Sequence, residues 1–437
     1  MVFDKLFGWG KKKKEDPAIS FGRYSDNNKS VTKVNRWTEA DNLFKNKDYH
    51  QCIEAFFDYL RDDQEQNVVL ERNGQEGRFQ VFQGSKVVRG EFNNDRLHAE
   101  ITLAKMPQAS VPVMRRLLEM NFNLYYSRYA LDQERLCMRF DTDIKTANPN
   151  KLYYGLKELA TKADKQDDLL VQEFASLQTI DTDHVAEIPL AEKEVKYTYF
   201  QKWISETLDY IKTLDADKFS GGIAYLLLTL AFRIDYLVSP EGQLQNELEK
   251  LVDIYYRKDE RQTIERNQLM REAYEKLLLK PREDVFPYLF RSRHTFSIVS
   301  PQKYDVVTDA INAAAQNMPF YNENGHAFIA NKVMEYPLAF SQYSYSLPKP
   351  WTALFRMFMQ VNYADYMAAL GFNTRYYDVT NHSFDVDAIQ ETIEKIMDEW
   401  KPKYPHLTFR LQNLKYENLV NFNQSFSAEV AALNFEA

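Results

Sequence analysis

The chain has 437 residues, which predicts two to three domains, and its 44% hydrophobic and 27% charged residues exclude wholesale disorder. A net charge of −8 offers no basic footprint for nucleic acid, and only 13 glycines argue against Gly-rich phosphate loops. The two cysteines, Cys52 and Cys137, lie inside apolar patterns, which favours buried free thiols in a reducing compartment. We therefore expect a cytoplasmic protein.

Residues 1–34 are predicted to form a flexible N-terminal arm. The arm opens with MVFDKLFGWGKKKKE, where apolar residues precede a Lys run, an order that does not fit a signal peptide. One interpretation is weak peripheral contact with a membrane surface, with lysines drawn to anionic lipid. The other is a frayed tail that docks on the protein itself. The residues that would make the membrane contact are Phe3, Phe7, Trp9, Lys11, Lys12, Lys13 and Lys14.

A helix is predicted over Asn35–Asp63, with a break near Asn46–Asp48 and with Thr38 as its start signal. Four strand-like runs follow, and the last one alternates most cleanly, which is typical of an antiparallel sheet with one wet face. The four runs are Asn67–Arg72, Arg78–Gln83, Lys86–Phe92 and Arg96–Ala104.

A second helix is predicted to begin after its capping residue, Ser110. Two more strands, Leu124–Leu131 and Arg135–Asp141, precede a third helix that opens at Asn148 and runs toward Phe174. The apolar face of the second helix is predicted to consist of Val113, Leu117, Leu118 and Met120.

The element order of Trp37–Phe174 resembles the type III secretion chaperone-like fold, in the version found in YbjN-type domains. The stretches that carry the resemblance are RFQVFQGSKVVRGEFNNDRLHAEITLAKMP and the following VPVMRRLLEMNFNLYYSRYALDQERLCMRFD. This chain departs from the pattern, because four strand-like runs precede the second helix where three are usual. The resemblance implies a domain over residues 35–177 that binds polypeptide through a sheet or helix face and often dimerises. It transfers no functional residue.

Residues 178–192 are polar and predict a linker, and residues 193–280 predict a helical domain of antiparallel neighbours joined by short connections. Within it, Phe219–Val238 is apolar on all sides and is predicted to be a buried helix. No stretch is expected to span a membrane, because the nearest, Ile223–Val238, is too short once its two charged residues are counted.

Residues 281–437 predict a C-terminal α+β domain in which helices and strands are mixed. Its predicted helices are Tyr304–Ala315, Trp351–Leu370 and Asp385–Trp400. Its predicted strands are Phe296–Val299, Ala327–Val333, Phe340–Ser346, Arg375–Val379 and Leu407–Leu411.

The titratable side chains predict no catalytic, cofactor-binding or metal-binding residue. The seven histidines are scattered, and none lies at metal-ligand spacing from a Cys or another His. Asp141–Asp143 lacks a third carboxylate, so a strand-end turn is favoured over a metal pair. Ser220–Gly222 opens a buried helix, where close packing is favoured over anion binding. For the basic cluster of Arg291, Arg293 and His294, rim salt bridges are favoured over a phosphate or carboxylate partner.

Residues 343–351, YSYSLPKPW, predict a rigid, aromatic-rich loop. Such a loop suits partner binding, through Tyr343, Tyr345 and Trp351, but a loop that packs on the core between a strand and a helix fits the same pattern.

These patterns predict an α+β fold made of a secretion-chaperone-like α/β sandwich module, a central helical bundle and a C-terminal α+β region. The first function hypothesis is a non-enzymatic protein-binding adaptor or chaperone-like component of a cytoplasmic bacterial assembly. Its partner would be another protein, a second copy of the chain included, and no cofactor is expected. The alternative is an enzyme or small-ligand-binding protein with its site in the C-terminal half, which holds most of the histidines.

Overall fold

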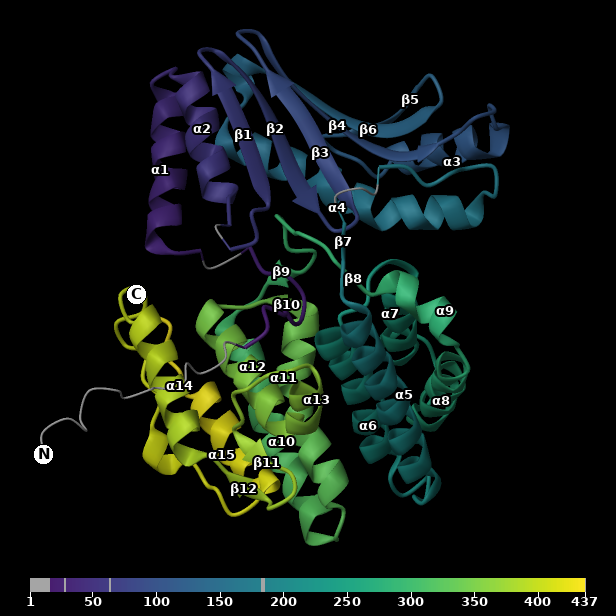
Figure 1. The fold of residues 1–437 in the computed structure, drawn as a ribbon, viewed down its shortest axis with the longest axis vertical. Coiled ribbons are helices and arrows are strands. Elements are labelled where there is room, and N and C mark those ends of the chain that lie inside the picture. The colour runs from purple at the N-terminus through teal and green to yellow at the C-terminus, as the bar shows by residue number, and fades with distance from the viewer. Residues whose placement is uncertain (1–15, 27–28, 63, 182–184, 437) are drawn as a thin grey trace, which may run out of the picture.

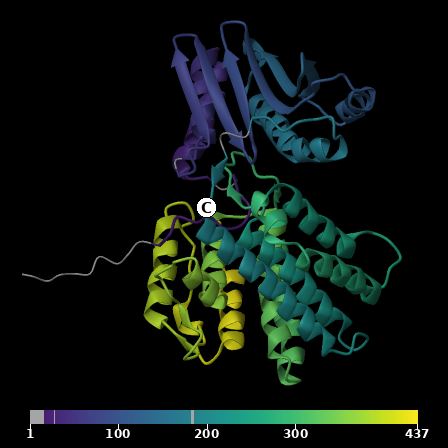
Figure 2. The same cartoon turned by 45° about the vertical axis from the view of Figure 1, so that its right-hand side comes forward.

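The computed structural model describes residues 16–26, 29–62, 64–181 and 185–436. These residues form two parts with separate hydrophobic cores, one above the other in Figures 1 and 2. We call residues 29–181 the module, residues 185–436 the body and residues 16–26 the arm. The predicted α+β class is confirmed, because the module combines helices with a six-stranded sheet and the body is largely helical with small sheets.

The module contains the predicted helices, and all four strand-like runs before the second predicted helix are strands. Its first helix begins at Val31, where the Ser30 side chain caps it, so the predicted start at Thr38 is wrong. The predicted break is confirmed, with Lys47 in the left-handed region. The module's elements are α1 Val31–Lys45, α2 Tyr49–Leu60, β1 Val68–Asn73, β2 Glu76–Gln83, β3 Lys86–Phe92, β4 Arg96–Lys105, α3 Val111–Asn121, β5 Arg128–Asp132, β6 Arg135–Asp143, η1 Ile144–Thr146 and α4 Pro149–Glu173.

The six strands form one antiparallel sheet in the order β1-β2-β3-β4-β6-β5. Alternation decides its two faces, as β4 shows, where Leu97 and Ala99 are buried while His98 and Glu100 are only partly covered. Helices α2 and α4 pack on the apolar face. Gly155 lets α4 approach closely, since a Cβ there would lie 2.6 Å from the Phe140 ring.

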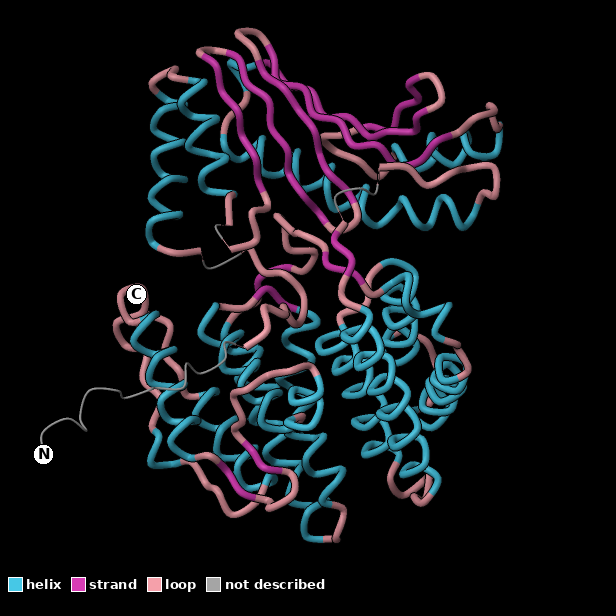
Figure 3. Tube along the Cα trace, in the orientation of Figure 1, coloured by secondary structure: helices cyan, strands magenta, loops and turns pink. Residues whose placement is uncertain are grey.

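The body consists mainly of helices, as the tube in Figure 3 shows. Its elements are β7 Ala186–Glu187, α5 Leu190–Lys212, α6 Ser220–Arg233, the π-helical turn η2 Ile234–Val238, α7 Gly242–Tyr256, α8 Thr263–Leu278, α9 Arg282–Val285, η3 Phe286–Tyr288, β8 Phe290–Arg291, β9 Ser300–Pro301, α10 Tyr304–Glu323, α11 Ala327–Ser344, β10 Tyr345–Ser346, α12 Lys349–Asn362, α13 Ala364–Ala369, β11 Tyr377–Asp378, β12 Ser383–Phe384, α14 Val386–Trp400, η4 Leu411–Asn413 and α15 Leu419–Ala431.

One hydrophobic cluster runs through the body, and it contains residues of both stretches that the sequence assigns to separate domains. The buried helix predicted over Phe219–Val238 is confirmed as α6 with η2. Within the described residues, Ser220–Val238 is long and apolar enough, by length and composition alone, to cross a membrane, and 89% of its 18-residue apolar window is buried inside the body. The expectation that no stretch meets that measure is therefore wrong.

Two predicted strands of the C-terminal half are wrong, because Ala327–Val333 and most of Phe340–Ser346 lie in the single helix α11. Pro337, which separates the two runs in the sequence, sits inside this helix. An interior proline costs about 3 kcal/mol. Burial of α11 side chains such as Val333 and Leu338 in the body core offsets that cost.

Three further predictions for this half need correction. Phe296–Val299 and Leu407–Leu411 form no strand; irregular chain buries Phe296, Leu407 and Phe409, whereas Ile298 is exposed. Arg375–Val379 shrinks to β11, which pairs with β12 as a small hairpin. The helix predicted over Trp351–Leu370 divides into α12 and α13 at Tyr363. In each case the sequence shows which residues are apolar. Their spacing does not show whether they belong to a helix, a strand or irregular chain.

The body inserts a side chain into the module. Phe296 is fully buried in the module's core, with its ring 5.6 Å from that of Tyr153. The residue before it, Thr295, donates its hydroxyl to the carbonyl of Phe82 at 2.8 Å, and its backbone amide donates to the side-chain Oε1 of Gln83 at 3.3 Å. The two parts are therefore joined by shared packing as well as by the chain.

The arm lies in the seam between module and body, and alternate residues face opposite parts. Arg23 points to the body, where its guanidinium makes two bonds to Asp235 at 2.8 and 3.0 Å. Ser25 also points to the body, with its hydroxyl 2.5 Å from that of Ser346.

Tyr24 and Asp26 hydrogen-bond to the module, and the Tyr24 ring also stacks against His294 of the body. The Tyr24 hydroxyl donates to Asp62 at 3.2 Å, and the Asp26 carboxylate accepts from the Tyr153 hydroxyl at 2.7 Å. This period of two is that of an extended strand, so the arm connects both parts along its length.

Candidate functional site

The outer face of α3 exposes apolar side chains. Val111, Leu118 and Phe122 are 74%, 64% and 91% exposed. Their spacings of seven and eleven residues place them on one side of the helix or its continuation. The opposite side carries Val113 and Leu117, which are buried in the module core. Leu118 was predicted for the buried face, so that assignment is wrong.

The turn after α3 continues this surface and is held rigidly. Tyr125 is 91% exposed and Tyr126 is 41% exposed. The backbone amides of Tyr125, Tyr126 and Ser127 donate to the carboxylate of Glu158, on α4, at 2.8 to 2.9 Å, and the Ser127 hydroxyl donates at 2.7 Å. Burial acts to raise the pKa of Glu158, but these hydrogen bonds hold it below its ordinary value.

We call Val111, Leu118, Phe122, Tyr125 and Tyr126 the α3 patch. Figure 1 shows α3 at the end of the module away from α1 and α2. The adjoining strand β5 is an edge of the sheet. Its Tyr129 amide donates to the Asn121 side chain at 2.8 Å. The Glu158 and Asn121 side chains thus occupy the backbone donors of residues 125–127 and 129 beside the patch.

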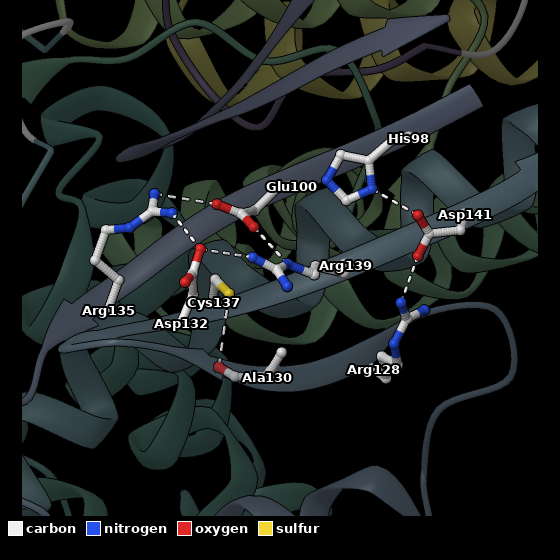
Figure 4. A network of polar contacts seen from close by, with 9 residues as sticks. All are labelled: His98, Glu100, Arg128, Ala130, Asp132, Arg135, Cys137, Arg139 and Asp141. Atoms are coloured by element: carbon white, nitrogen blue, oxygen red, sulfur yellow. Dashed lines mark hydrogen bonds and ion pairs between the residues drawn. The ribbon is translucent and has the colours of Figure 1, made fainter. Parts of the chain in front are cut away.

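The outer face of the sheet carries charges that pair with one another (Figure 4). Asp141 accepts from His98 Nδ1 at 2.6 Å and from Arg128 at 2.5 Å. Burial opposes the charge on Asp141, but these two partners lower its pKa below the ordinary value. Beside this group, a second network alternates in sign through Glu100, Arg139, Asp132 and Arg135.

Two open grooves of about 480 and 500 Å³ lie on this face. Both are lined by Glu71, Arg78, Glu91 and His98 from strands β1 to β4. Neither includes a residue of the C-terminal half. Their walls are exposed charges of both signs, which is typical of a solvated sheet face.

The thiols do not add a nucleophile to this face. Cys137 is buried, and its sulfur lies 3.6 Å from the Ala130 carbonyl that accepts its hydrogen bond. Burial raises the pKa of Cys137 to about 11 and that of Cys52 to about 12. Both thiols therefore stay protonated near neutral pH. Over residues 16–436, where the structure describes them, no three His, Cys, Asp or Glu side chains gather in a way that could hold a metal ion.

A buried ionic cluster lies inside the body. Glu335 accepts from Arg233 at 3.0 Å, from Lys332 at 2.8 Å and from the Tyr363 hydroxyl at 2.5 Å. Arg233 also lies over the Tyr363 ring, 4.9 Å from its centroid. Burial and the neighbouring Arg233 lower the pKa of Lys332 to about 8. The cluster pairs two cations with one carboxylate in a tightly packed interior, an arrangement that fits a structural role.

The predicted aromatic loop over residues 343–351 is largely absent. Tyr343 belongs to α11 and lies beneath the Arg23 guanidinium, 4.0 Å from its ring centroid. Tyr345 is half-buried in β10, which pairs with β9. Trp351 is 1% exposed, and its Nε1 donates to the Val430 carbonyl. These side chains pack on the body core, as the second interpretation of the loop expected.

The basic cluster lies in the seam. Arg291 pairs with Glu192 at 3.0 Å, which confirms the predicted salt bridge. Arg293 lies 3.4 Å from the centroid of the Phe82 ring, and His294 stacks beside Tyr24.

Other candidates are also accounted for by packing. Asp141 is part of β6 rather than of a turn after it. Gly222 lets α6 approach α10, because a Cβ there would lie 2.9 Å from the Tyr321 ring. His326 lies against Phe219. The residues predicted to contact a membrane, Phe3, Phe7, Trp9 and Lys11 to Lys14, lie outside the described part of the chain.

The α3 patch was missed in the sequence because Leu124–Leu131 was assigned to a strand. Only its second half is strand, since β5 begins at Arg128. A signal was present: the predicted helix carries apolar residues on the side opposite its core face, at Val111, Leu118 and Phe122.

No protein-family model matches this chain, and no curated protein is significantly similar to it.

Proposed function

We propose that this chain is a non-enzymatic protein-binding adaptor or chaperone-like component of a cytoplasmic bacterial assembly, and that the α3 patch is its binding surface. The observation that carries the proposal is the pair Phe122 and Tyr125, each 91% exposed, with Phe122 at the end of α3 and Tyr125 on the turn that Glu158 holds in place. Isolated exposed apolar residues are ordinary, but adjoining ones mark contact sites.

The physical case rests on aromatic burial at little entropic cost. Aromatic side chains dominate the energy of protein interfaces because they bury large areas. A turn already fixed by four hydrogen bonds to Glu158 loses little freedom on binding. The partner chemistry is therefore an apolar face on another protein, a second copy of this chain included.

The resemblance to the secretion-chaperone-like fold supports the same proposal. The module follows the element order of that resemblance, with helices, strands, α3, two strands and α4, but it has four strands before α3 where three are usual. Proteins of that fold bind polypeptide and often dimerise, which agrees with a patch that takes a protein partner.

The test places a photo-crosslinking amino acid at position 122 in cells that make the protein, with position 279 as the matched control. Leu279 is 82% exposed but lies on the body, between α8 and α9. We expect a discrete adduct from position 122 only, lost when Tyr125→Ala is added. An adduct at twice the 51.5 kDa chain mass identifies a second copy. Equal crosslinking from both positions, or none from 122, overturns the proposal.

A further inference from the structure

The contact between α4 of the module and α7 of the body gathers carboxylates (Figure 1). Asp164, Asp167 and Asp168 lie on one face of α4 at spacings of three and four. Asp164 accepts from the Ser85 amide at 2.8 Å. Asp167 accepts from the Ser85 hydroxyl at 2.9 Å and pairs with the fully buried Lys86 at 3.2 Å.

The body contributes a fourth carboxylate. Glu241 directly precedes α7 and accepts from the Ser292 hydroxyl at 2.5 Å. Asp168 reaches the next residue, Gly242, so closely that a Cβ there would lie 2.5 Å from its Oδ2 and 3.3 Å from the Tyr288 ring. The carboxylates of α4 therefore pack directly against the start of α7 in the body.

Charge is not balanced at this contact. Among the described residues, Lys86 is the cation with a salt bridge to this group of carboxylates, through Asp167. Other nearby cations pair with carboxylates outside this group, in the pairs Lys165–Glu249, Lys196–Glu192, Arg291–Glu192 and Lys280–Glu247. Asp167, which is 3% exposed, also has an oxygen buried without a hydrogen-bond partner.

We propose that protons complete this contact: module and body hold the observed arrangement while the carboxyls of Asp164 and Asp168 are protonated, and the contact loosens when they ionise. Four ionised carboxylates against one Lys repel one another in a partly buried space. Protons on Asp164 and Asp168 remove two of these negative charges, and each protonated carboxyl can donate a hydrogen bond.

The electrostatics of the individual groups agree with this proposal. Burial and the charges of Glu241 and Asp167 raise the pKa of Asp164 well above its ordinary value. Burial and Asp167 raise the pKa of Asp168 to about 6, against the opposing effect of Lys86.

The direction of the pH effect follows from linkage. An acid whose pKa is raised in the assembled state binds its proton more tightly there than when the parts separate. Its contribution is full below the ordinary pKa of 3.8 and is lost as the pH rises through the raised pKa, which is about 6 for Asp168. The contact therefore weakens toward neutral and alkaline pH.

Energy transfer between two dyes on the full chain measures the arrangement directly. Gln75→Cys, at the exposed β1–β2 turn, and Leu279→Cys carry the dyes, because both native thiols are buried. We expect transfer efficiency to change between pH 5 and pH 8, with its midpoint near pH 6, where Asp168 titrates. The Asp164→Asn/Asp168→Asn chain should keep the pH 5 value throughout.

The matched control is Asp305→Asn/Asp309→Asn, which removes the same charges at the same spacing from the exposed side of α10. It should respond to pH as the unmodified chain does. Circular dichroism at both pH values reports whether each variant is folded, and Asp168→Asn alone replaces the double variant if that one is not. A pH-independent unmodified chain, or an undiminished response in the Asn variants, overturns the proposal. Crosslinking at position 122 is unaffected by either result.

Discussion

The charges on the module's sheet face and those inside the body both form close ion pairs, yet the two sets of pairs differ in what they contribute to stability. Glu100 and Arg139 meet at 2.5 Å but remain partly in water. Glu335 and Arg233 meet at 3.0 Å with side chains 1% and 4% exposed. Solvent screens the first pair, so either partner can be lost at low cost. In the second pair, loss of one partner leaves a charge in a medium that cannot solvate it.

The difference shows that the distance between the paired atoms does not predict how much stability is lost when one partner is removed. That loss depends on how exposed the pair is and on how many charges share one counter-charge. The following substitutions test that ranking, from the largest expected effect to the smallest.

Glu335→Gln should destabilise the chain most, by about 3–5 kcal/mol, because Arg233 and Lys332 then lie buried without a carboxylate. Urea unfolding followed by circular dichroism measures the change. Glu323→Gln, at the exposed end of α10, should stay within about 0.5 kcal/mol of the unmodified chain. Equal effects of the two substitutions would contradict the ranking.

Arg23→Gln should cost about 2–4 kcal/mol, because it leaves Asp235 without its two-bonded partner at a largely buried site. Proteolysis within residues 16–26 should also become faster, because the arm loses its main bond to the body. Arg23→Lys keeps the charge but not the two-bonded geometry, so its stability should lie between that of Arg23→Gln and that of the unmodified chain. An arm as resistant in Arg23→Gln as in the unmodified chain would refute this role.

Glu158→Gln should cost about 1–2 kcal/mol, because three backbone amides lose a charged acceptor. Hydrogen exchange should speed up at Tyr125, Tyr126 and Ser127. The lowered pKa of Glu158 gives the sign: its contribution is present above the ordinary carboxyl pKa and is lost as the pH falls through the lower native value. The unmodified turn should therefore loosen in acid, while the Gln variant should show no such transition.

Glu100→Gln should have the smallest effect, about 1 kcal/mol or less, because its partners Arg139 and Arg135 stay solvated. The effect should shrink further in 1 M salt, where the screening length is about 3 Å. Unfolding at low and high salt measures both. A loss as large as that of Glu335→Gln would mean that the sheet face is covered in solution.

The module was more predictable than the body because strands in a sheet with one solvent-exposed face alternate apolar and polar residues. Lys86–Phe92 was predicted with the bounds that β3 has. In the body, α11 carries buried residues on most sides, so neither a period of two nor one of 3.6 stands out. Pro337 predicted a boundary between two strands, but tertiary packing keeps the chain helical through this residue.

The candidate site could be predicted only in part for a related reason. The aromatic residues near Tyr343 and those near Tyr125 look alike in the sequence, but the first group packs inside and the second lies outside. What separates them is a contact across the chain, the carboxylate of Glu158 beneath the Tyr125 turn. A single sequence does not reveal such long-range partners.

The insertion of Phe296 into the module has a consequence for synthesis on the ribosome. The module's own last core residue, Leu177, is made about 120 residues before Phe296. At roughly 5–20 residues per second, the nascent module waits on the order of ten seconds with that position in its core unfilled. Until the body emerges, the module is a partly open apolar surface at the tunnel exit, where a nascent-chain chaperone would find it.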